Sequence, residues 1–568
     1  MNKSIYDLVT TEKSFYETTP VPIFDNYDWN MYEHIKQSVF YKNSQYTKGK
    51  GDRPFKNIIR PILNVQYRAE GFNVTDIEPY INNRDEYYKS FLIRKFHDRW
   101  AYKNSIDTFV DQMVEAYVDF GGVLVKRTKE KPIVVPWQRI AFVDQTDVLN
   151  GPICEKHYYS PDEFKREAAT RGWDNAEEVL TFAEANKQTK DNQQKTPGKY
   201  IEVYEIHGVF PETFINEEGD EDKYSEQLHV ITYYQSGKEK KGITLYSGPK
   251  KSPFKFLARD AIYGRALGLG GAEELFEPQI WLNYDTIRIK EMLDQASKIL
   301  YQTADSAFKT RNRTENLSQG EILVHEQGGA LDRINNTPIN INAFTSSVEA
   351  WENNARLIGS ATDPVLGEQP PSGTPFRLQA LITQQATSIH EYRKGKLATF
   401  LGEIYRDWII PDLKREIVKG DEFMEELDSG ELNEVADRIS KSLTNEEVKE
   451  RVLNGEAVYN NDTDLMREEI KRRFIEEGNH KLIKIIKDEF KDSPLDVRVN
   501  VAGKQKDLTV VADKLTNVFR QLIASPQVLQ DPNMRKLFDS IMEASGLSPL
   551  SFSAPLVQQP IKPELTKV

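Results

Sequence analysis

The sequence predicts an α+β fold, in which a strand-rich N-terminal half is followed by long helices. From Lys131 to about Ala258, short apolar segments alternate with turn residues, which is the pattern of β-strands. From Ala272 onward, apolar side chains recur at helical spacing instead. The chain has 568 residues, 39% of them hydrophobic. This length favours roughly two to four folding units.

The first part of the chain predicts helices that lead into a strand. Residues 1–50 are polar and rich in Tyr and Asn, and we expect an N-terminal arm there. A helical stretch is expected over Phe55–Arg68, and apolar spacing predicts another helix over Glu86–Asp119. Phe120–Gly122 ends that helix, because glycine suits the left-handed position after a helix. Val123–Val125 is then predicted to be a strand.

The strand-rich region contains a well-marked helix start. Ser160 can act as N-cap, Pro161 suits the first helical position, and Glu163 completes a capping box. This helix is expected to reach Arg171. Ser236–Gly237 fits a hairpin tip. A second helix is expected over Ala176–Asn186, and strands are expected at Ile133–Val135, Arg139–Val143, Tyr200–Val209, Leu228–Tyr234 and Ile243–Tyr246.

Long helices then alternate with short irregular segments. Apolar side chains form one stripe along Ala272–Ala304, which predicts a helix about 45–50 Å long. Pro278 is compatible with it only near the helix start. Phe308–Ile341 is expected to form short strands and turns, and Thr345–Ser360 a helix.

A proline- and glycine-containing loop over Asp363–Pro375 leads to a second long helix, Phe376–Ile410. Gly395 lies where this helix is easiest to bend, and Pro411 is expected to stop it. Further expectations are a charged, largely helical stretch at Lys419–Phe490, a strand at Val497–Val501, helices at Leu508–Ala524 and Asn533–Ala544, and an extended tail from Ser548.

Several protein classes find no support in the sequence. No run of about 18 apolar residues predicts a membrane span, and the first residues lack the pattern of a secretory signal. The single Cys154 excludes an internal disulfide framework and suits a reducing cytoplasm. The net charge of -13 does not favour tight DNA binding, since that depends on neutralising phosphates.

Catalytic signatures are not found either. The glycine-rich stretch Gly264–Gly271 lacks the lysine of a phosphate-binding loop, and we interpret it as a flexible lead into a helix. His157, His207 and His229 have no metal-ligand spacing and favour an interpretation as ordinary core or surface histidines. Glu273 and Glu274 fit a helix first turn. We expect no enzyme, catalytic residue, cofactor or metal.

Two small basic groups accompany the helices. Lys309, Arg311 and Arg313 follow the first long helix, and Arg393, Lys394 and Lys396 lie near Gly395. A solvated charged face is the more ordinary interpretation of each group.

Several short motifs stand out along the chain. They are Phe120–Val125, Gly264–Gly268 followed by Glu274–Ser297, Ser360–Pro364 leading to Pro371–Arg377, Asp496–Thr509 and Leu515–Pro526. These motifs and the order of parts resemble bacteriophage portal proteins, the head-to-tail connectors, and are similar to portals of crAss-like and related podoviruses. The resemblance covers roughly residues 55 to 545.

The resemblance implies a portal fold with named parts. They are an N-terminal arm (1–50), a mixed α/β wing (51–263), a stem helix (264–304), a small β-containing clip (305–341), a second stem helix (342–360), a tunnel loop (361–376), a kinked wing helix (377–418), a mainly helical C-terminal wing and crown (419–547) and a flexible tail (548–568).

The same resemblance implies a function and its residues. The protein would form a homo-oligomeric ring, a dodecamer, at one capsid vertex of the virion, after assembly in the host cytoplasm. Double-stranded DNA would pass through it during packaging by the terminase motor, retention and ejection. Neck or adaptor proteins and the major capsid protein would bind it, and no membrane would be involved. The tunnel loop would contribute Glu368, Gln369, Pro370, Pro371, Ser372, Gly373 and Thr374, the clip Lys309, Arg311 and Arg313, and the helix kink Gly395.

Two alternatives remain open. One is another structural protein of the virion neck or capsid. The other is a nucleic-acid-processing enzyme whose acidic residues come from several elements and carry no recognisable spacing.

Overall fold

The computed structural model describes residues 4–44, 54–81, 87–187, 200–366 and 376–419, with short gaps inside 200–366. It also describes shorter stretches between 437 and 477, and residues 495–499. The chain divides into two compact units. The first contains Met1–Glu70, Gln112–Lys126 and Val134–Arg393, and the second contains Gly71–Asp111, Arg127–Ile133 and Lys394–Val568.

Residues 4–44 of the expected N-terminal arm pack into the first unit. They form α1 (Ile5–Thr18), β1 (Val21–Phe24), β2 (Tyr27–Trp29) and α2 (Met31–Lys42). Ser4 and Asn30 cap the two helices through their side chains. The few apolar residues lie on one side of each helix, and Val9, Tyr16, Trp29, Met31 and Ile35 join the main core.

The largest sheet of the first unit is antiparallel, with strand order β10-β9-β8-β7-β6. One core contains buried side chains of α1 and of the sheet, and a second core lies under α6 (Pro161–Arg171) and α7 (Ala176–Lys187). The predicted capping box of Ser160 and Glu163 is present at α6. The strands are β6 (Ile140–Phe142), β7 (Ile153–Tyr159), β8 (Ile201–Pro211), β9 (Tyr224–Ser236) and β10 (Glu239–Pro249).

A second strand pair lies at the end of α5 (Ile106–Phe120). Strand β4 (Gly122–Arg127) pairs antiparallel with β11 (Phe254–Ala258). Gly121, between α5 and β4, has φ +75, and a Cβ there would lie 2.2 Å from the carbonyl oxygen of Gly268. Only glycine allows this close approach. The glycine-rich stretch is therefore tightly packed rather than a flexible lead. The neighbouring strand β5 covers Pro132–Val134.

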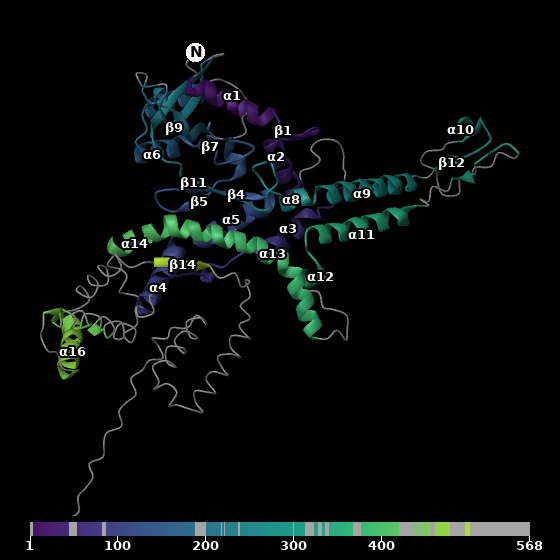
Figure 1. Cartoon of the computed structure of the whole chain (residues 1–568). Coiled ribbons are helices and arrows are strands. Elements are labelled where there is room, and N and C mark those ends of the chain that lie inside the picture. Colours follow the sequence, from purple (N-terminus) through teal and green to yellow (C-terminus); the bar gives the residue numbers. More distant parts are fainter. Residues whose placement is uncertain are drawn as a thin grey trace, which may run out of the picture. The chain divides into compact units, whose positions relative to one another are not determined.

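Two long helices of the first unit lie side by side, and small elements that connect them in the sequence lie at one end of the pair (Figure 1). After α3 (Ile59–Glu70) and α8 (Gly271–Glu274), the pair consists of α9 (Phe276–Ala296) and α11 (Ile341–Ile358). Between them come β12 (Tyr301–Gln302), α10 (Phe308–Arg311) and β13 (Asp332–Arg333), and α12 (Asp363–Leu366) follows.

The predicted helix Ala272–Ala304 is correct in kind but too long. It is interrupted at Leu275 and ends at Ala296. Pro278 explains the interruption, because it has no N–H to donate to the carbonyl of Glu274. The 21 residues of α9 correspond to about 32 Å, shorter than predicted.

The second unit contains a strand pair that joins distant parts of the sequence. Strand β3 (Ile77–Ile81) pairs antiparallel with β14 (Leu495–Val499), close to the predicted strand. Helix α4 (Tyr87–Lys103) contributes His97, whose Nε2 lies 3.1 Å from the hydroxyl of Tyr405. The 3-10 turn η1 covers Val74–Asp76, and α16 covers Asn460–Glu477. The helices predicted beyond residue 500 lie outside the described residues.

The second predicted long helix runs on further than expected. Helix α13 (Phe376–Ile404) passes through Gly395, then a π-helical turn at Tyr405–Ile409 leads into α14 (Ile410–Lys419). Pro411 therefore does not stop the helix. It occupies the first turn of α14, where a missing N–H is tolerated best. Bending at Gly395 stays a prediction.

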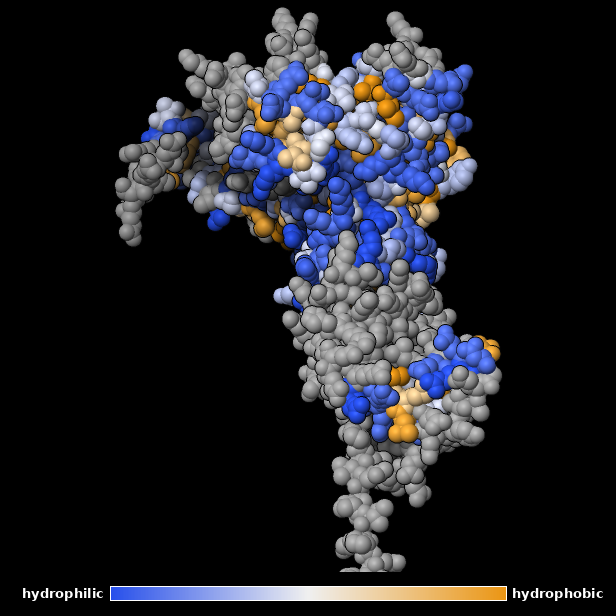
Figure 2. Space-filling model, turned by 90° about the vertical axis from the view of Figure 1, so that its left-hand side faces the viewer, coloured by the Kyte–Doolittle hydropathy of each residue, from blue (hydrophilic) through white to orange (hydrophobic). Residues whose placement is uncertain are grey.

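The surface drawn in Figure 2 is predominantly hydrophilic, with hydrophobic residues scattered among charged and polar ones. Within the described residues, no helix combines the length and apolarity needed to cross a membrane.

Candidate functional site

The α9–α11 pair forms a helical hairpin with a compact tip. Between its helices, the Ser347 hydroxyl donates to Asp285 at 2.6 Å, and the rings of Trp281 and Trp351 stack 6.4 Å apart. These contacts hold the helices together along part of their length. Along the chain, the order is a long helix, small strand and helix elements, and a second long helix.

The predicted clip residues have different environments at the tip. Arg311 lies between two carboxylates, 2.8 Å from Asp305 and 2.7 Å from Glu326. It therefore organises the tip itself. Lys309 is exposed. Arg313 and the tunnel-loop residues 368–374 lie outside the described residues.

Several large apolar side chains of α9 remain partly exposed, including Trp281 beside its contact with Trp351. Ile280, Trp281, Tyr284 and Leu293 are 39%, 47%, 54% and 50% exposed. The guanidinium of Arg288 lies 5.0 Å from the ring centre of Tyr284. Trp, Tyr and Arg are the side chains most often found at the energetic centres of protein interfaces. This surface has the composition of a protein contact.

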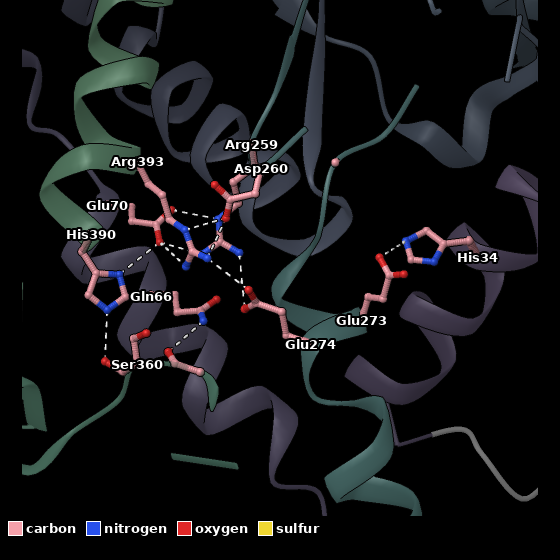
Figure 3. Close-up of polar contacts among 12 residues, drawn as sticks. His34, Gln66, Glu70, Arg259, Asp260, Glu273, Glu274, Ser360, His390 and Arg393 are labelled. Atoms are coloured by element: carbon pink, nitrogen blue, oxygen red, sulfur yellow. Dashed lines mark hydrogen bonds and ion pairs between the residues drawn. The ribbon is translucent and has the colours of Figure 1, made fainter. Parts of the chain in front are cut away.

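A buried group of charges lies where the hairpin begins (Figure 3). We call Glu70, Arg259, Asp260, Glu274, His390 and Arg393 the junction cluster. Glu70 and Arg259 are both fully buried, and their closest N–O distance is 2.6 Å. Arg393 of α13 reaches Asp260 at 2.6 Å and Glu274 of α8 at 3.0 Å. The cluster thus joins α3, α8, α13 and the end of β11.

The ionisation of Glu70 follows from these neighbours. Burial alone would raise its pKa, but hydrogen bonds from His390 and Arg259 outweigh burial and hold the pKa below its ordinary value. Glu70 is therefore a carboxylate.

A second carboxylate nearby, Glu273, has an arginine and a histidine as neighbours, but here the histidine is neutral. Arg265 binds Glu273 at 2.6 Å, while His34 lies 3.6 Å from the same carboxylate. Burial, opposed by Glu273, lowers the pKa of His34 to about 4, so it is neutral near pH 7.

A second buried group, which we call the sheet cluster, contains Lys126, Glu155, His157 and Glu205. The register of β7 and β8 places Glu155 directly opposite Glu205. Like charges at such positions repel, and Lys126 compensates them from 2.7 and 2.9 Å. Despite burial, interactions with Lys126 and the histidines lower the pKa of Glu205, and that of Glu155 falls to about 2.

The sheet cluster also brings together three groups with the spacing of metal ligands, namely Glu155, His157 and Glu205. The ammonium group of Lys126 already bridges the two carboxylates, and Arg171 lies 3.3 Å from Glu205. Two cations thus balance the two carboxylates before any ion is added. This arrangement favours a structural ion-pair network over a metal site.

Sequence reasoning missed the junction cluster. Arg393 and Lys394 were expected on a solvated face, yet they are 4% and 2% exposed. Glu273 and Glu274 do lie in a helix first turn, as predicted, but their arginine partners were not foreseen. His390 was not singled out. The only hint in the sequence was that Arg393, Lys394 and Lys396 lie close to the apolar residues of α13. This pattern does not reveal which side of the helix is buried.

Comparison with known proteins adds no identification: no family model matches the chain, and no curated protein matches it.

Proposed function

We propose that this protein is a bacteriophage portal protein, a ring-shaped channel for DNA at one vertex of the capsid. The observation that carries the proposal is the α9–α11 hairpin with its small tip. Two long helices with small elements at one end are the arrangement expected of the stem and clip that the sequence resemblance implies, and this supports the proposal. The α+β composition of the first unit is compatible with the wing.

The exposed apolar side chains of α9 support assembly into a ring. Tyr284 and Leu293 would be covered by the hairpin of a neighbouring copy. A ring requires one face of the subunit to fit a different face of the next subunit. The remaining exposed positions of α9 carry both signs of charge, as in the Lys290–Asp294 pair. If these positions of α9 line the channel, their mixed charges and the chain's net charge of -13 would disfavour adhesion of DNA phosphates.

Electron microscopy of the purified full chain in negative stain tests the proposal directly. We expect rings with a central hole. Leu293→Ser removes an apolar side chain that is 50% exposed from the proposed contact and should reduce the fraction of rings. Tyr102→Ser changes an aromatic residue that is 86% exposed on α4, and should leave ring formation intact. Monomers or filaments from the unmodified chain would contradict a portal.

Two further measurements separate the alternatives. Metal-dependent nuclease or ATPase turnover by the purified chain would favour the enzyme. Deleting residues 368–374 should preserve rings and impair DNA packaging or retention, whereas a neck component of other function would show no such defect.

Charge reversal at Lys309 tests whether the tip binds a partner protein. It is a cleaner test than charge reversal at Arg311, because Arg311 also holds the tip together.

A further inference from the structure

His390 joins three parts of the first unit at a single buried point (Figure 3). It lies on α13 and is 1% exposed. Its Nδ1 is 3.1 Å from Oε1 of Glu70 on α3, and its Nε2 is 3.1 Å from the carbonyl oxygen of Ser360. Each ring nitrogen therefore faces an oxygen.

Both of these oxygens are acceptors. A backbone carbonyl cannot donate, and the Glu70 carboxylate is bound by the guanidinium of Arg259. A neutral imidazole carries one N–H, whereas an imidazolium carries two. Only the protonated ring can donate to both oxygens. Loss of the proton would leave a nitrogen lone pair facing an oxygen in a site without solvent, which is unfavourable.

Charged groups of both signs surround His390 among the described residues. The carboxylates that face this region are Glu70 from α3, Asp260 after β11, and Glu274 from α8. Arg259 and Arg393 bind these carboxylates, and Lys394, next to Arg393 on α13, is also buried. The need for a second N–H on His390 follows from its two acceptor oxygens. The hydroxyl of Tyr117 on α5 donates to the backbone carbonyl of Arg393, and adds no charge while protonated.

The Ser360 contact holds an unusual backbone. Ser360 follows α11 and has φ +53, a left-handed conformation that is unfavourable for a residue other than glycine. The preceding carbonyl, of Gly359, accepts a hydrogen bond from Gln66 of α3 at 2.9 Å. Two consecutive carbonyls at the end of α11 are thus held by side chains from other helices. Surrounding contacts of this kind are what maintain a strained conformation.

We propose that His390 is a proton-dependent latch, which in its charged form fixes the end of α11 to α3 and α13 through Glu70 and Ser360. When the proton is lost, the Ser360 contact weakens and the segment from Ser360 to Leu366 opens locally. This device does not depend on the proposed function. In a portal, it would regulate the segment that leads into the tunnel loop.

Hydrogen exchange of backbone amides, followed by mass spectrometry on the full chain, tests the latch. Exchange is measured from about pH 5 to about pH 9, which spans the range where imidazoles commonly titrate, and is corrected for intrinsic rates. We expect protection of residues 356–366 to fall roughly tenfold as pH rises, since a hydrogen bond from a charged donor is lost. This series on the unmodified chain requires no variant to fold.

Two variants locate the effect. His390→Gln should show low protection of residues 356–366 at every pH and no further pH dependence, because an amide does not titrate. His34→Gln changes another buried histidine of the same unit, and should keep the pH dependence of the unmodified chain. Protection that is independent of pH in the unmodified chain, or a pH response that persists in His390→Gln, would overturn the latch.

Discussion

The two buried charge groups of the first unit differ in how they are built. The sheet cluster follows from strand register, because neighbouring strands place Glu155 opposite Glu205 and one ammonium group, that of Lys126, compensates both. The junction cluster joins helices from distant parts of the chain. Glu70 and His390, which meet in it, are separated by 320 positions.

This difference indicates different tolerances to change. Lys126 is the only ammonium group among the described contacts of the sheet cluster, so its removal leaves two carboxylates with weaker partners. The junction cluster shares its charge among two arginines and a histidine. Its positive charge is thus spread over several side chains, but the cluster depends on planar guanidinium groups that bind two oxygens at once. The first cluster should be sensitive to charge and the second to geometry.

The largest expected effect is in the sheet cluster. Lys126→Met should lower the free energy of unfolding by about 3–5 kcal/mol, because it leaves buried carboxylates without their cation. Urea denaturation measures this change. Lys156→Met, at a more exposed lysine of β7, should cost less than about 1 kcal/mol. Equal losses in the two variants would show that burial of the charge is not what matters.

Acidification should weaken the same cluster. The folded-state pKa of Glu155, about 2, lies below the ordinary value of 4.5, so its stabilisation is present above pH 4.5 and is lost as pH falls toward 2. The loss is on the order of 3 kcal/mol. Urea midpoints at a series of pH values measure it. Glu155→Gln should flatten this dependence, and an unchanged slope would contradict the assignment.

Geometry rather than charge is tested at Arg259. Arg259→Lys retains a positive charge but cannot bind both oxygens of Glu70 in a planar pair. We expect a loss of about 1–3 kcal/mol in the free energy of unfolding. Arg68→Lys, on the exposed side of the same helix as Glu70, is the matched control and should be nearly neutral. If Arg259→Lys is also neutral, the junction cluster depends on charge alone.

The smallest expected effect concerns the strained backbone at the end of α11. Ser360→Gly removes the cost of a left-handed serine and keeps the carbonyl that His390 binds. The gain is offset in part by the greater chain entropy of glycine when unfolded, so the net change should be below about 1 kcal/mol. The thermal midpoint should rise slightly. A clear decrease would mean that the serine side chain itself is needed.

Local features of the fold could be predicted from the sequence where neighbouring residues decide them. The Ser160 capping box is an example, because its partners are three residues apart. The expectation that the helix begins close to Pro278 is confirmed, whereas the expectation that Pro411 stops the later helix is wrong. A proline cannot donate a backbone hydrogen bond to the carbonyl four residues earlier. Whether the helix needs that bond depends on how far the proline lies from the start of the helix.

The sequence by itself determined the element types and much of their order, because hydrophobic periodicity and caps act over a few residues. It did not determine which charges meet. In the sequence, the residues next to Arg393 are as polar as those next to a solvent-exposed arginine. Only the packing of α13 brings Arg393 to Glu274 and Asp260. The two oxygens that face the ring nitrogens of His390 likewise come from distant segments, and they meet only in the folded chain.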